Sequence, residues 1–269
     1  MLRRYDRERF VTALFASPDR REDLFTLYGF NLEIARIRET VSEPLLGQIR
    51  LQWWREALDK AEGGAAAGHP VADSLADLLA RHSLPRAAID RLLAARAFDL
   101  EDRPPEDLAE LMAYIEDSAA GLTALAAQLL GGGDQATQEA ARHVGRAWGL
   151  LGLMRAHAYH IKLRRLFLPA DWLAGQGLDA EEILAGAAPP ALARLAEQWA
   201  DQVASDLRAA RALRREIDQA ALAALLPARL ADFHLGALRR ARYDLLDRGW
   251  SGIASRPLTL LGTSLLRHF

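Results

Sequence analysis

The chain has 269 residues, and 51% of them are hydrophobic, which is enough to build a sizeable buried core. The 34 basic and 36 acidic residues nearly cancel, so the charge balance gives no reason to expect nucleic acid as a partner. There is no cysteine, which excludes disulfides, thiolate zinc sites and cysteine nucleophiles.

Helical signals follow one another along the chain. The first residues carry acids and no apolar run, so we expect no secretory signal. Glycine-rich breaks at 63–68 and 131–133 separate segments with helical spacing, and the apolar residues of 108–129 and of 144–161 each predict one buried stripe. No strand-like alternation and no run of about eighteen apolar residues stands out. We therefore expect an all-α fold, one domain over residues 1–269 and no membrane span, although the apolar segment Pro257–Leu261 could touch a membrane surface.

Two parts of the sequence are distinctive. The first comprises Tyr28–Glu39, Val41–Pro44 and Gly47–Glu56, and the second comprises Gly145–Arg155 and Arg164–Pro169. Taken together and in this order, they resemble the squalene/phytoene synthase family over roughly residues 5–244. The resemblance implies a single-domain isoprenoid synthase-type helical bundle around a central cavity.

Active members of that family bind magnesium through aspartates on two facing helices. The ions spread the negative charge that builds on a diphosphate leaving group, and they prefer carboxylate oxygens. By this resemblance the five aspartate positions fall here on Ala35, Arg36, Glu39, Ala156 and His160, so only Glu39 keeps a carboxylate. The comparison implies that no metal binds at this place and that no residue can be named as catalytic.

The retained pattern resembles one branch in particular, the mitochondrial complex I assembly factors of this fold and their bacterial relatives. That implies a non-catalytic assembly or scaffold role with a respiratory complex I subunit or assembly intermediate as partner. For a bacterial chain it also implies a cytoplasmic location, with peripheral contact to the inner membrane left open.

Two other functions stay open at this point. One is a Mg²⁺-dependent head-to-head prenyl transferase acting on farnesyl or geranylgeranyl diphosphate. It would need metal ligands such as Glu33, Glu39, Glu116 or Asp117. The other is a module that holds an isoprenoid lipid without chemistry.

Candidate pocket or ligand-binding residues lie in and around the two motifs. They are Tyr28, Glu33, Arg36, Glu39, Trp53, Asp117, Gly152, Arg155, His160 and Arg165.

Several of these features have a plain structural interpretation as well. The small residues Gly145, Gly149 and Gly152 share a helix face with Ala156 and His160, and that face either lines a pocket or admits a neighbouring helix. The basic cluster at 160–165 either grips an anionic head group or is a solvated surface.

Two pairs of neighbouring side chains leave a similar choice. One of Trp53 and Trp54 should enter the core, and the other should border a pocket or an interface. His157 and His160 either share a metal or belong to a polar group.

Overall fold

The computed structural model describes residues 1–247, 249–250, 252, 260–262 and 269, and within these residues every regular element is helical. The α-helices are α1 Leu2–Tyr5, α2 Arg7–Ala13, α3 Pro18–Ala35, α4 Ile37–Thr40, α5 Pro44–Glu62, α6 Pro70–His82, α7 Arg86–Ala95, α8 Leu108–Ile115, α9 Gly121–Leu129, α10 Gln135–His160, α11 Ala170–Gly175, α12 Ala180–Leu184, α13 Pro190–Ala212, α14 Leu222–Leu225 and α15 Pro227–Arg240. Short 3₁₀ turns are η1 Phe98–Leu100, η3 Ile161–Leu163 and η4 Gln219–Ala221, and η2 Glu116–Ala120 is a π-helical turn.

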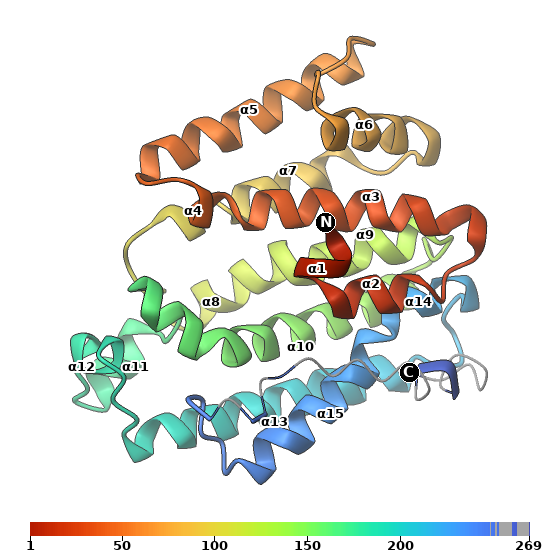
Figure 1. Cartoon of the computed structure of the whole chain (residues 1–269). Coiled ribbons are helices and arrows are strands. Elements are labelled where there is room, and N and C mark those ends of the chain that lie inside the picture. The colour runs from red at the N-terminus through yellow and green to blue at the C-terminus, as the bar shows by residue number, and fades with distance from the viewer. Residues whose placement is uncertain (248, 251, 253–259, 263–268) are drawn as a thin grey trace.

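The long helix α10 crosses the middle of the molecule (Figure 1). It packs against α9 and η2 on one side and against α13 and α15 on the other. Helix α3 lies beyond α9, and α5 with α6 forms the outermost layer on that side. This arrangement brings the C-terminal ends of α3 and α10, which carry the two motifs, into the same part of the bundle.

Local sequence signals explain the main helix ends. Gly131 follows α9 with a φ of +108°, a backbone conformation that L side chains rarely adopt. Asp134 then caps α10, because its carboxylate accepts a hydrogen bond of 2.8 Å from the Thr137 N–H. The predicted breaks at 63–68 and 131–133 are confirmed.

The predicted apolar stripes are confirmed except at one end. Residues of α10 such as Val144, Leu151 and Met154 are completely buried. Leu108, however, is 50% exposed, so its assignment to the buried stripe of 108–129 was wrong. That stripe is also interrupted, since η2 widens the helix between α8 and α9 and shifts the register of the side chains that follow.

The stretch Gln219–Arg240 is long and apolar enough to cross a membrane by composition alone, with a hydropathy of 1.3. Since 72% of that apolar window is buried inside the protein, it matches a core helix of the bundle equally well. Of the predicted membrane-touching segment, residues 257–259 lie outside the described residues, while Leu260 is buried and Leu261 is exposed. The single-domain organisation of residues 1–269 stays a prediction.

Candidate functional site

The first motif spans a break in the helix. Helix α3 ends at Ala35, Arg36 adopts φ −95° and ψ 1°, and α4 starts at Ile37. The guanidinium group of Arg36 lies 3.4 Å from the Glu39 carboxylate and 4.1 Å from the centre of the Tyr5 ring. The only carboxylate retained among the five motif positions therefore faces a cation of the same motif.

Tyr28 and Glu33 lie on α3, before this break. Tyr28 is buried, and burial raises the pKa of its phenol to about 12. Glu33 is only partly buried. Tyr28 is thus a core residue of α3 that stays protonated at neutral pH.

The second motif contributes Arg155 to a buried ion-pair network. Its guanidinium group donates to Glu8 of α2 over 2.7 Å, and His234 of α15 donates to the same carboxylate over 2.7 Å. Burial raises the pKa of Glu8, but the hydrogen bonds and charges of His234 and Arg155 outweigh this effect and leave the pKa below its usual value. Arg155 stays a predicted pocket or ligand-binding residue, and in the structure its guanidinium group pairs with Glu8 of α2.

The ends of the two motifs meet at Tyr159. The Tyr159 hydroxyl donates a hydrogen bond to Glu39, so the phenol lies against the Arg36–Glu39 pair. Burial raises the pKa of Tyr159, and the charge and hydrogen bond of Glu39 raise it further. The ring of His160, the next residue, packs beside Phe167, with the ring centres 4.7 Å apart. Burial, together with the charge of Arg165, lowers the pKa of His160 to about 4, so the ring is neutral at pH 7.

A buried polar network fills the space between α3, η1 and α8. Arg96 donates to Asn31 over 3.2 Å, to Asp99 over 3.2 Å and to the Tyr114 hydroxyl over 2.9 Å. Tyr114 in turn donates to Asp99 over 3.0 Å, and burial raises its pKa. Arg165 completes the network at 3.3 Å from Asp99. Arg165 is therefore held by a protein carboxylate.

The glycine face of α10 combines both interpretations that the sequence left open. A Cβ on Gly145 would run into the backbone of Ala120, with the Ala119 carbonyl oxygen at 2.8 Å, and a Cβ on Gly149 would lie 2.8 Å from Ile115. At Gly152 a Cβ would meet nothing within 4 Å. The N-terminal part of the face thus admits the π-helical turn η2, and only the end near the motif has space beside it.

The alternative magnesium ligands are not brought together. Glu116 pairs with Arg142 over 2.6 Å and with Arg146 over 3.0 Å, both well before Arg155 on α10. Asp117 lines a small crevice with Arg91 and Arg142. Within the described part of the chain, no three His, Asp or Glu side chains are grouped so that they could hold a metal ion, and this includes His157 and His160.

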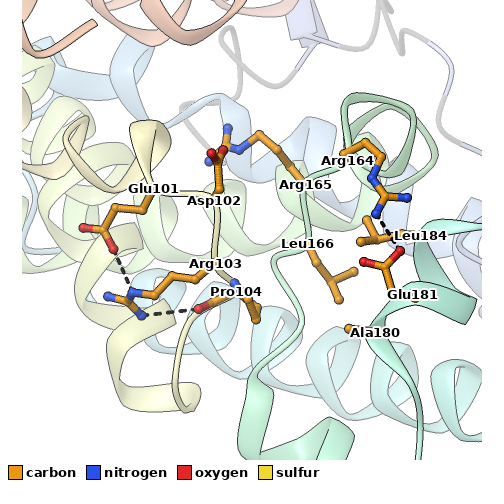
Figure 2. A pocket seen from close by; sticks show the side chains of 10 residues that line it. All are labelled: Glu101, Asp102, Arg103, Pro104, Arg164, Arg165, Leu166, Ala180, Glu181 and Leu184. Atoms are coloured by element: carbon orange, nitrogen blue, oxygen red, sulfur yellow. Dashed lines mark hydrogen bonds and ion pairs between the residues drawn. The ribbon is translucent and has the colours of Figure 1, made fainter. Parts of the chain in front are cut away.

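The basic cluster at 160–165 is divided among several carboxylates. Figure 2 shows the crevice of about 130 Å³ beside it, where Arg164 pairs with Glu181 over 2.5 Å and Arg103 pairs with Glu101 over 2.8 Å. Arg165 points to Asp99, as described above. Because acidic and basic side chains pair with one another at this crevice, an anionic ligand would have to displace existing ion pairs.

The two tryptophans of α5 separate as predicted. Trp54 is buried and meets Phe30 edge-on with ring centres 5.2 Å apart. Trp53 is 37% exposed and lies in a shallow outer groove with Leu46, Ile49 and His69. Trp53 therefore borders the protein surface.

Sequence reasoning missed Glu8, Asn31, Arg96 and Asp99. Glu8 is 147 residues from Arg155 and 226 from His234, so no spacing rule connects them. Arg96 and Asp99 lie outside both motifs, although their one-turn separation was a readable signal for an ion pair.

The amino-acid sequence is similar to known proteins of one family. A profile of the squalene/phytoene synthase family matches residues 2–257. Among curated relatives, "NADH dehydrogenase (ubiquinone) complex I, assembly factor 6" of Bos taurus is 29% identical over 98% of this chain and 78% of its own length. A phytoene synthase of Cereibacter sphaeroides is 28% identical, but over only 49% of this chain and 37% of its own length.

Solved structures confirm the fold. A squalene synthase, HpnC, from Alicyclobacillus acidocaldarius superposes with a TM-score of 0.79 at 20% identity, covering 90% of this chain and 91% of its own. A dehydrosqualene synthase superposes with a TM-score of 0.81 at 17% identity, covering 98% and 93%. The predicted all-α isoprenoid synthase-type fold is thus confirmed.

Proposed function

This chain belongs to the squalene/phytoene synthase family, and on that premise we propose that it performs no prenyl transfer and acts instead in the assembly of respiratory complex I. The proposed lack of prenyl transfer rests on the ion pair between Arg36 and Glu39 at the first motif. Arg36 occupies a position at which an active member of the family would present a carboxylate.

A cation at this position opposes magnesium directly. Two like unit charges about 4 Å apart repel by roughly 4 kcal/mol at an effective dielectric near 20, and a divalent ion doubles that repulsion. Glu39 is the remaining carboxylate, and it is engaged by Arg36 and by Tyr159. On α10, Ala156 offers no ligand atom, and the His160 ring packs beside Phe167. These side chains support a site that is stable without a metal.

The extent of the sequence similarity supports the proposed role in complex I assembly. The complex I assembly factors match this chain over nearly its whole length, whereas the phytoene synthases match only about half of it. An assembly factor works through its surface, and α5 exposes several large apolar side chains. Leu45, Leu46, Ile49 and Trp53 of α5 are between 37% and 60% exposed, and the last three line one shallow groove. Contiguous exposed apolar side chains of this kind mark contact surfaces in soluble proteins. We assign this α5 surface to the contact with a complex I subunit or assembly intermediate.

The proposal is tested in cells from which this chain has been deleted, by measuring assembled complex I after re-expression. The unmodified chain and Glu39→Gln should both restore assembly, because no catalytic carboxylate is needed. Ile49→Arg should fail to restore it while keeping the melting temperature of the unmodified chain, because Ile49 is 58% exposed.

Two results would contradict the proposal. Restoration that depends on Glu39 would indicate catalysis at the motif. Unchanged complex I in the deleted cells would remove the assembly role.

A further inference from the structure

A second hollow lies between α8, α11 and α13 with α10 as its base, and these four helices can be followed in Figure 1. Its volume is about 480 Å³, within the range of pockets that hold small molecules. Leu150, which contributes to the base, lies on nearly the opposite side of α10 from Gly152, two residues later. This hollow, named here the α8–α13 pocket, is therefore separate from the glycine face of the motif helix.

The walls of the α8–α13 pocket are apolar and fixed by the fold. Leu150, Leu195 and Trp199 are at most 5% exposed and belong to the tightly packed pair α10 and α13. Helix α11, which carries Trp172, is attached to the segment before α8 by hydrogen bonds from the Ala170 N–H to the Pro105 carbonyl (2.8 Å) and from the Asp171 N–H to the Glu106 carbonyl (3.0 Å). A pocket with such anchored walls exists before a ligand arrives, which lowers the entropic cost of binding.

The rim of the α8–α13 pocket has a definite polarity. Its polar side chains are Asp171, Gln198 and Gln202, all exposed, and none of the described residues that line it is Lys, Arg or His. Gln202 donates its amide N–H to Asp206 over 3.1 Å, which leaves its carbonyl oxygen to accept. Asp171 accepts a hydrogen bond from the backbone N–H of Trp172 through one carboxylate oxygen, and the other oxygen can accept as well. The rim therefore offers acceptors, the amide N–H groups of Gln198 and one negative charge.

We propose that the α8–α13 pocket binds an amphiphilic small molecule whose apolar body packs on Trp172 and Trp199 and whose head donates hydrogen bonds to the rim. A hydroxyl or an ammonium head satisfies the acceptors, and an ammonium gains further from the carboxylate and from the indole faces. A carboxylate, phosphate or diphosphate head meets the negative charge of Asp171, and the described lining residues provide no cation to offset it. The proposal does not depend on a role in complex I assembly, since the pocket and its rim are defined without any protein partner.

The test is titration calorimetry of the full chain at pH 7 with three ten-carbon probes, decan-1-ol, decylammonium and decanoate. We expect decanol and decylammonium to bind with one-to-one stoichiometry and decanoate to bind at least tenfold more weakly. Asp171→Asn should weaken decylammonium about fivefold and leave decanol unchanged. Leu108→Arg, which places a cation at the exposed mouth, should reverse the preference between decylammonium and decanoate.

Ile49→Arg is the matched control, because it introduces the same charge on the exposed α5 surface, away from the pocket. It should leave all three affinities unchanged. Equal binding of decanoate and decylammonium would overturn the proposal, as would a loss of binding in Ile49→Arg as large as in Leu108→Arg. Melting curves of each variant confirm that the folded chain is being compared.

Discussion

The buried carboxylate of Glu8 joins three distant parts of the chain, so we predict that Glu8→Gln is among the most destabilising conservative changes. Glu8 is 8% exposed, and its partners Arg155 and His234 have side-chain exposures of 15% and 2%. Glutamine keeps the shape and one acceptor oxygen but removes the charge that balances Arg155. Breaking a buried ion pair from one side costs about 3–5 kcal/mol, and the partial exposure of Arg155 favours the lower end, about 3 kcal/mol.

Thermal unfolding of the purified chain measures this effect. A loss of about 3 kcal/mol corresponds to a fall in melting temperature of about 6–12 °C for a chain of this size. Glu39→Gln is the matched control, since its ion pair with Arg36 is about one-third exposed on both sides and contributes at most about 1 kcal/mol. The double variant Glu8→Gln, Arg155→Met should lose less than the sum of the two single changes. The reasoning would be refuted if Glu8→Gln had the same melting temperature as Glu39→Gln. It would also be refuted if the stability losses of Glu8→Gln and Arg155→Met were strictly additive in the double variant.

Three further predictions follow from the interior of the bundle. Gly145→Ala should destabilise the chain by more than about 1 kcal/mol because the new Cβ meets the backbone of Ala120, whereas Gly152→Ala should be neutral or stabilising by up to about 1 kcal/mol. Equal melting temperatures of the two variants would contradict this prediction. Burial lowers the pKa of His157 to about 4, so below about pH 6.5 the unfolded chain takes up a proton that the folded chain does not, and the free energy of unfolding should fall as the pH drops from 6.5 to 4. In urea titrations His157→Gln should reduce this dependence on pH, and an unchanged pH dependence would contradict the prediction. Tyr114→Phe should lower the free energy of unfolding by about 1–2 kcal/mol, because Arg96 and Asp99 lose their hydrogen bonds to a buried hydroxyl. Urea unfolding measures this loss, and an unchanged free energy would show that the network does not depend on the hydroxyl.

Much of the fold could be predicted because its signals are local. The Asp134 cap, the positive φ at Gly131 and the apolar spacing along α10 each depend on neighbours within a few residues. The separation of Trp53 from Trp54 follows equally from the 100° step between adjacent helical residues.

The details that the sequence did not predict arise from contacts between distant segments. The helix break at Arg36 and the π-helical turn at Glu116–Ala120 are not marked by proline. The turn is instead accommodated by Gly145 and Gly149, which let α10 approach it closely. Arg155 lies within a motif, but its partner Glu8 is supplied by a helix at the other end of the chain. A single sequence gives no rule for such pairings.

The proposed lack of prenyl transfer at the motif site is the central point to test. The direct test is diphosphate release from farnesyl and geranylgeranyl diphosphates with magnesium and a reductant present, comparing the unmodified chain with Glu39→Gln. The Arg36–Glu39 ion pair predicts no release above the protein-free background from either protein, both folded by circular dichroism. Release by the unmodified chain that disappears in Glu39→Gln would contradict the account and identify an active prenyl transferase.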